Sequence, residues 1–183
     1  MPISSFSIIS QVACELNHKM PATVLDVGCG SGFYGAVVRN FVDMGWGNRT
    51  RLVGVEPFPE YKNELWKAYT FVYIKTVQDY LQFAQNTLYD FILFLDVIEH
   101  MGRLEGLSIV EQLKEHLMPG GVLLVSTPGE FTQQKEMYGN PLEKHISFYE
   151  PQDFISRDFV VIRDPRKECQ FHQKMLVAKY TME

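Results

Sequence analysis

Cysteines and long apolar runs are both scarce in this chain of 183 residues. Its three cysteines are Cys14, Cys29 and Cys169, without the CxxC spacing of a structural zinc site. Their odd number leaves one unpaired in any disulfide scheme, which favours a reducing compartment, and we predict a cytoplasmic protein. No apolar stretch approaches the roughly 20 residues of a membrane-spanning helix, and residues 1–10 lack the pattern of a secretory signal. We therefore expect no membrane partner.

Basic charge is also in short supply. Lysine and arginine total 17 against 22 acidic residues, a formal net charge of −5. Proteins that bind nucleic acids usually present a basic surface that displaces counterions from phosphates, so DNA or RNA is an unlikely partner. Internal repeats, low-complexity tracts and Pro/Ser-rich linkers are missing as well. The sequence thus predicts one domain over residues 1–183.

Apolar segments of strand length alternate with segments of helical periodicity along most of the chain. The pattern predicts strands at 23–27, 51–55, 71–74, 90–95 and 122–126. It predicts helices at 5–17, 33–42, 61–69 and 77–84, and a further helix whose apolar face includes 107 to 117. Residues 127–150 show no periodicity, and 159–163 with 174–180 suggest a closing hairpin. Alternation of this kind indicates an α/β fold. We predict a doubly wound, mostly parallel, Rossmann-like sheet with an antiparallel strand in the C-terminal hairpin.

A glycine-rich loop, Gly28-Cys29-Gly30-Ser31-Gly32, directly follows the first predicted strand. Alone, such a loop is as consistent with a tight turn as with a binding site. A nicotinamide dinucleotide site is the main rival, but its GxGxxG fingerprint needs a small residue where this chain has Phe33. Its ribose carboxylate would also stand about 20 residues after the motif, whereas Glu56 is 28 residues after Gly28.

Three carboxylates, Asp26, Glu56 and Asp96, come at the ends of the first, second and fourth predicted strands. The carboxyl ends of parallel strands meet at one edge of a sheet, where ligands bind in this fold class. An anionic pyrophosphate would avoid such acids, because it needs bare backbone N–H groups. Carboxylates instead favour a cation, and S-adenosylmethionine carries a sulfonium and an ammonium group. Each acid by itself could still be a solvated loop residue or a helix cap.

Four segments resemble, in order, the motifs of class I S-adenosylmethionine-dependent methyltransferases. They are VLDVGCGSG (24–32), GVEPF (54–58), DFILFLDVIEHM (90–101) and LMPGGVLLVSTP (117–128). The resemblance covers about residues 23–128, and four motifs in sequence are far more specific than a glycine loop. It implies a methyltransferase fold, a methyl-transfer activity and S-adenosylmethionine as the cofactor.

The resemblance also implies roles for individual residues in cofactor binding. Asp26 would hold the ammonium group, Glu56 would accept hydrogen bonds from the ribose hydroxyls, and glycines would let the backbone approach the methionine part. Relatives often carry an acid near the adenine where this chain has Thr76, with Asp79 three residues on. The complete predicted cofactor set is Asp26, Gly28, Cys29, Gly30, Glu56, Pro57, Phe58, Thr76, Val77, Leu95 and Asp96.

Two histidines are candidate catalytic residues, His100 and His145. Methyl transfer mainly requires alignment of donor and acceptor, and a base is needed only when the acceptor must lose a proton. His100 follows Asp96 by about one helical turn, and His145 lies after the irregular segment expected to cover the site. Local packing is the alternative role for either ring. Because the histidines and cysteines lack ligand spacing, the sequence predicts no metal site.

The leading functional hypothesis is a methyltransferase acting on an O, N or C atom of a small molecule. Alternatives are a methyltransferase for protein or RNA, a catalytically silent cofactor-binding scaffold and, more distantly, an NAD-dependent oxidoreductase. The chain has no large inserted cap. We therefore expect a pocket that is either open or completed by a second subunit in a homodimer.

Overall fold

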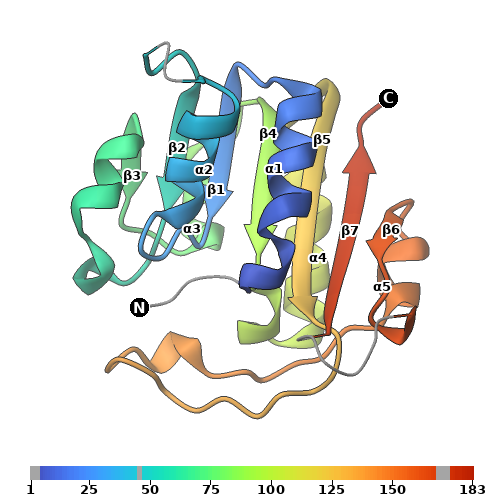
Figure 1. Ribbon diagram of the computed structural model, residues 1–183. Coiled ribbons are helices and arrows are strands. Elements are labelled where there is room, and N and C mark those ends of the chain that lie inside the picture. Colours follow the sequence, from blue (N-terminus) through green and yellow to red (C-terminus); the bar gives the residue numbers. More distant parts are fainter. Residues whose placement is uncertain (1–4, 45–46, 168–173) are drawn as a thin grey trace.

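A seven-stranded sheet forms the centre of the computed structural model, which describes residues 5–44, 47–167 and 174–183 (Figure 1). The strand order is β3-β2-β1-β4-β5-β7-β6, and only β7 runs against its neighbours. The predicted doubly wound sheet with an antiparallel strand in the C-terminal hairpin is confirmed. The strands are β1 (Thr23–Val27), β2 (Arg51–Val55), β3 (Phe71–Tyr73), β4 (Tyr89–Leu95), β5 (Leu117–Pro128), β6 (Val160–Arg163) and β7 (Met175–Thr181).

Helices cover both faces of this sheet, and each face has its own apolar core. The helices α1 (Ile9–Lys19) and α2 (Phe33–Phe41) lie on one face, with core residues such as Leu16 and Val38 packed against Leu93 of β4. On the other face lie α3 (Val77–Phe83), α4 (Arg103–Glu115) and α5 (Pro151–Ile155). Successive β4 residues alternate between the two cores, as expected for a strand buried on both faces.

Short 3₁₀ helices account for most differences from the predicted elements. The helix predicted at 5–17 begins as a 3₁₀ turn, η1 (Phe6–Ile8), and that predicted at 61–69 is replaced by η2 (Pro59–Tyr61) and η3 (Glu64–Ala68). The other 3₁₀ helices are η4 (Ile98–His100), η5 (Pro141–Glu143) and η6 (Pro165–Lys167). The Asn63 side chain accepts the Leu65 N–H at 2.8 Å and so caps the start of η3. A new helical turn therefore begins here, and one continuous helix over 61–69 does not form.

Two further boundaries were wrong in the prediction. Leu117 was assigned to the preceding helix, but it begins β5 and pairs with Tyr89, and a register shift follows in β4. The strand therefore continues through Gly120 and Gly121 instead of starting after them. The helix α5 was not predicted at all, although Pro151 stands at its first turn and the Glu150 N–H donates to the Asp153 carboxylate at 2.8 Å.

The order of strands reverses between β1 and β4, which pair with each other in parallel. Open α/β sheets bind ligands at this switch point, beyond the carboxyl ends of the strands. In Figure 1 these ends point downward, and the irregular segment 129–150 runs across beneath them. Among the described residues, no helix has the length and apolar character needed to cross a membrane.

Candidate functional site

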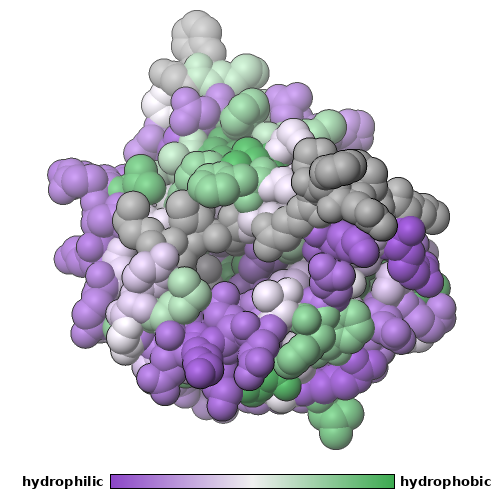
Figure 2. All heavy atoms as spheres, turned by 60° about the horizontal axis from the view of Figure 1, so that its bottom comes forward, coloured by the Kyte–Doolittle hydropathy of each residue, from purple (hydrophilic) through white to green (hydrophobic). Residues whose placement is uncertain are grey.

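A cavity of about 580 Å³ opens at this switch point. Figure 2 views the molecule with this end turned forward and shows purple hydrophilic residues beside green hydrophobic ones. The described residues that line the cavity include six carboxylates and no lysine or arginine. The acids are Asp26, Glu56, Asp96, Glu99, Glu105 and Glu143. The site therefore suits a cationic ligand much better than an anionic one.

The glycine loop is held open by its backbone conformation. Gly28 has φ +70°, and a Cβ there would lie 2.4 Å from a methyl carbon of Val97. The N–H groups of Gly28 and Cys29 donate to the carbonyl of Val55 at 2.8 and 3.1 Å, which ties the loop to the end of β2. A side chain at Gly28 would thus be both strained and obstructed, and the bare backbone faces the cavity.

Asp26, the fourth residue of β1, is only 3% exposed. Its Oδ2 atom accepts a hydrogen bond from the Tyr69 hydroxyl at 2.5 Å. Burial raises the pKa of Asp26 to about 7; the Tyr69 hydrogen bond opposes this rise and the nearby Glu56 charge adds to it. A carboxylate can accept several hydrogen bonds, so Asp26 can still bind a cationic group beside the Tyr69 hydroxyl.

Glu56, directly after β2, links the two loops of the site. Its Oε2 accepts the Gly30 N–H and its Oε1 accepts the Phe58 N–H, both at 2.9 Å. Burial raises the pKa of Glu56 to about 7, against the opposing effect of these two hydrogen bonds. Each oxygen keeps a second lone pair, so the carboxylate can hold the loops and still accept ligand hydroxyls.

Asp96, directly after β4, has the unusual φ of +54° for a residue other than glycine. Its carboxylate accepts hydrogen bonds from the Ser126 hydroxyl at 2.5 Å and from the Ser5 N–H at 2.8 Å. Strained conformations of this kind persist only where surrounding contacts determine them, and they concentrate at functional sites. The contact with Ser5 also brings the N-terminal segment to the cavity, which Ser5 and Phe6 help to line.

The structure brings nearly all of the predicted cofactor residues together. Phe58 is the exception, because it does not line the cavity: its ring packs against Tyr61, with centroids 4.8 Å apart. Thr76 caps α3, since its hydroxyl accepts the Asp79 N–H and donates to the Asp79 carboxylate. Those that line the cavity are Asp26, Gly28, Cys29, Gly30, Glu56, Pro57, Thr76, Val77, Leu95 and Asp96.

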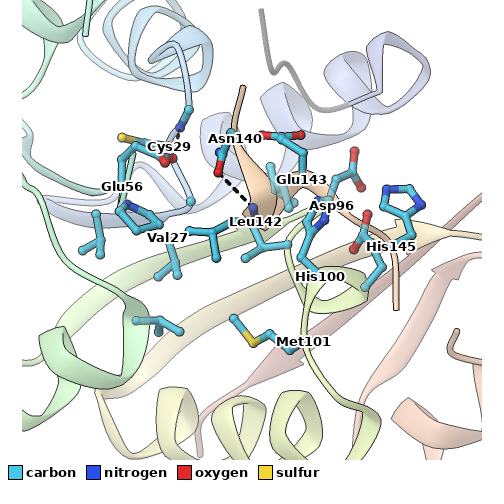
Figure 3. A pocket seen from close by; sticks show the side chains of 18 of the residues that line it. Val27, Cys29, Glu56, Asp96, His100, Met101, Asn140, Leu142, Glu143 and His145 are labelled. Carbon is cyan, nitrogen blue, oxygen red and sulfur yellow. Dashed lines mark hydrogen bonds between the residues drawn. The ribbon is translucent and has the colours of Figure 1, made fainter. Parts of the chain in front are cut away.

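His100 and His145 also meet at the cavity, with ring centroids 4.9 Å apart (Figure 3). Buried Glu99 is their neighbour, and one ligand atom from each of the three residues lies within 4.8 Å of the others. The sequence predicted no metal constellation, and this group escaped notice because His145 is far from the other two along the chain. Burial raises the pKa of Glu99 well above its usual range, and the Asp96 charge adds to this rise.

The segment after β5 supplies functional candidates that sequence reasoning missed. Asn140 is buried and donates to the Tyr61 hydroxyl at 3.1 Å, which in turn donates to Glu143 at 2.7 Å. Gln134 donates to the Glu143 carbonyl at 2.6 Å. These contacts fasten the segment over the cavity, where Leu142 lies between Glu56 and the histidines in Figure 3. The sequence predicted that this irregular segment covers the site, but no periodicity identifies the residues that hold it there, because they act through individual polar contacts.

The comparison with known protein families agrees with an acidic cavity at the switch point. The model of the family described as "Methyltransferase domain" matches residues 7–157. The chain belongs to this family. The predicted family and its class I methyltransferase fold are thereby confirmed for this chain.

Individual relatives of the methyltransferase are distant. The ubiquinone biosynthesis O-methyltransferase of Rickettsia typhi is 26% identical over 152 residues, which are 80% of this chain and 56% of that protein. The chain thus spans about half the length of the curated relatives it matches. Among solved structures, the N-methyltransferase NodS of Bradyrhizobium japonicum has a TM-score of 0.60 at 12% identity and covers 97% of each chain.

A second solved structure adds the same evidence for the fold. The 1,6-didemethyltoxoflavin-N1-methyltransferase of Burkholderia thailandensis has a TM-score of 0.64 at 17% identity, over 96% of this chain and 78% of its own. That structure contains its acceptor and S-adenosylhomocysteine. At these identities the likeness establishes the fold of the methyltransferase and leaves its acceptor to be argued from the site.

Proposed function

We propose that this chain transfers a methyl group from S-adenosylmethionine to a small-molecule acceptor in the cytoplasm. The observation that carries the proposal is the cavity at the switch point, with six lining carboxylates and no lysine or arginine among its described residues. Two of the relatives named above carry small molecules in their names, ubiquinone and 1,6-didemethyltoxoflavin. The unpaired thiols of Cys14 and Cys29 fit a reducing compartment.

The residues present fit the cofactor. Asp26 would hold its ammonium group, Glu56 would accept its ribose hydroxyls, and the bare backbone at Gly28 leaves room for a close approach. Tyr34 lines the same cavity, and its buried hydroxyl has no hydrogen-bond partner among the described residues. A ligand with a polar group there would satisfy it, because buried polar groups are costly when unpaired.

When bound, S-adenosylmethionine supplies an electrophilic methyl group on a sulfonium. The chain contributes alignment and exclusion of water. Asp96 and Leu95 line the cavity from the end of β4, while Asn140, Leu142 and Glu143 line it from the segment after β5. We propose His100 and His145 as the groups nearest the acceptor, where an imidazole can take a proton from a hydroxyl or ammonium.

Cofactor affinity is expected to rise as the pH increases from 5.5 to 7.5. Asp26 and Glu56 have pKa values raised to about 7, so the free protein keeps protons on them that a cationic ligand must displace. The unfolded chain releases these protons near pH 4, so both groups make the ligand-free fold less stable as the pH rises from about 4 to 7. Calorimetry with S-adenosylmethionine in two buffers of different ionisation enthalpy should detect proton release. A dissociation constant independent of pH over this range would contradict the role of these acids.

The proposed function is tested in two steps. Calorimetry with S-adenosylhomocysteine and with NAD should show binding of the first only. Methyl release from labelled S-adenosylmethionine is then measured over a panel of phenols, catechols, amines, peptides and RNA. We expect turnover with a phenol, catechol or amine; turnover only with peptide or RNA favours the macromolecular alternative. Cofactor binding without any turnover favours a silent scaffold.

We also propose that a homodimer completes the covered site. Gel filtration with light scattering at assay concentrations measures the oligomeric state directly. A strict monomer with full turnover would reject this part of the proposal.

A further inference from the structure

At the acceptor end of this cavity, two segments that are far apart in the sequence bring three possible metal-ligand side chains together. Glu99 and His100 lie on η4, directly after β4, and His145 lies on the segment that covers the cavity. Their ligand atoms lie within 4.8 Å of one another, and all three residues line the cavity.

Backbone contacts fix the orientation of both imidazole rings. His100 Nδ1 is 3.2 Å from the carbonyl of Lys144, and His145 Nδ1 is 2.8 Å from the carbonyl of Thr132. A carbonyl can only accept, so these contacts place a hydrogen on each Nδ1, and the neutral form of each ring then carries its lone pair on Nε2. This is the arrangement of metal-binding histidines, whose second nitrogen donates to a carbonyl or a carboxylate.

Glu99 provides an independent sign of a missing partner. The residue is 2% exposed, and its buried Oε2 atom has no partner of good hydrogen-bond geometry among the described residues. The Thr127 hydroxyl, also buried and without such a partner, lies near enough to oppose the rise in the Glu99 pKa. Its backbone carbonyl, in contrast, accepts the N–H groups of Ile146 and Ser147 at 2.9 and 3.1 Å. These bonds hold His145 beside Glu99, so the unpaired oxygen and the two imidazoles are kept together by the fold.

From these observations we propose that Glu99, His100 and His145 bind one divalent transition-metal ion at the acceptor end of the cavity. Two imidazoles and one carboxylate are a common ligand set for zinc and other first-row ions, and they leave coordination positions open. Ligands about 2.1 Å from a tetrahedral ion lie roughly 3.4 Å apart, so the side chains must move inward by about 1 Å. Magnesium prefers oxygen ligands and is expected to bind weakly.

The proposal rests on the proposed methyl transfer and narrows its acceptor to an oxygen compound. A hydroxyl that occupies an open position on the ion loses its proton more readily, since the ion stabilises the oxyanion. With the ion bound, both imidazoles act as its ligands and not as bases, so the proton leaves to water. The oxygen keeps the electron pair that forms the new carbon–oxygen bond as the carbon–sulfur bond breaks and S-adenosylhomocysteine leaves. Amines gain nothing from such an ion at neutral pH, because coordination occupies the lone pair that must attack.

The test measures metal binding alone, in the complete chain stripped with a chelator and without cofactor or acceptor. We expect calorimetry to show one Zn²⁺ per chain, and Co²⁺ to give visible absorption bands of a site with nitrogen ligands. Glu99→Gln, His100→Gln and His145→Gln should each weaken binding at least 10-fold, since each removes one of three ligands. His18→Gln and Glu60→Gln are the matched controls, because both residues are exposed and neither lines the cavity or belongs to the cluster.

The proposal is overturned if the stripped wild-type chain binds no Zn²⁺, or if His145→Gln binds it as tightly as His18→Gln does. Far-ultraviolet circular dichroism and thermal melting show whether each variant folds, and His145→Gln guards against a folding defect of the buried Glu99→Gln. Binding of S-adenosylhomocysteine separates this inference from the proposed function: a chain that binds this ligand but no Zn²⁺ keeps the methyltransferase proposal and rejects the metal site.

Discussion

Gly35→Ala is expected to lower the free energy of unfolding by roughly 3 kcal/mol. Gly35 lies on α2 beside the ring of Tyr69, and a Cβ there would lie 2.3 Å from Cε2 of that ring. The ring is also confined from β2, because a Cβ at Gly54 would lie 2.9 Å from its Cδ1 atom. Tyr69 therefore cannot yield to the new methyl group without leaving its position between the helix and the sheet.

The displacement would also disturb the cofactor site. The Tyr69 hydroxyl accepts the Gly35 N–H at 2.9 Å and donates to Asp26 at 2.5 Å. Moving the ring leaves the Asp26 carboxylate buried without its donor, a loss of about 1–3 kcal/mol beyond the overpacking itself. Helix propensity acts in the opposite direction, since alanine is favoured over glycine in a helix by about 1 kcal/mol.

Thermal melting and urea denaturation measure this effect. For a domain of this size, the expected loss corresponds to a fall in Tm of roughly 6–12 °C. Gly102→Ala is the matched control, because the nearest atom to its Cβ would be Glu105 Oε2 at 3.8 Å. If Gly35→Ala melts at the same temperature as Gly102→Ala, the packing of Tyr69 against α2 is wrong.

Glu56→Ala is expected to weaken binding of S-adenosylhomocysteine roughly 100-fold, the upper end for loss of charge-assisted hydrogen bonds. The proposed ribose contacts are lost together with the bonds that Glu56 accepts from the N–H groups of Gly30 and Phe58. The glycine loop and the loop after β2 are then no longer joined, so the site loses its shape as well as its charge. We expect a loss of affinity at the upper end of the range because Glu56 both binds the ligand and joins the two loops.

Calorimetry compares Glu56→Ala with Glu56→Gln and Glu60→Ala. The amide can still accept one loop N–H, so Glu56→Gln should be intermediate. Glu60 is exposed on η2 and loses the same charge four residues away, so Glu60→Ala should bind like the wild type. Unchanged affinity in Glu56→Ala would remove this residue from the cofactor site.

Local patterns in the sequence determined the fold class and most of the cofactor half of the site. The strands at 23–27 and 51–55 lie where alternation of apolar segments and turn signals put them. Asp26, Glu56 and Asp96 could be predicted to meet because each stands at the carboxyl end of a parallel strand, and strand order alone brings such ends together. Position after a strand could not show that Phe58 lies outside the cavity. Its ring packs against Tyr61 within the same loop.

The sequence named His100, His145 and a covering segment, but only the tertiary structure decided how they come together at the acceptor half. Glu99, His100 and His145 come together because Ile146 and Ser147 bond to the Glu99 carbonyl, a contact between segments with no shared periodicity. The cover over the cavity likewise depends on Asn140, Tyr61 and Glu143, three residues that ordinary turn and strand signals do not connect. Periodicity reports how a segment faces the core, whereas convergence of distant loops depends on individual hydrogen bonds that exist only once the chain is folded.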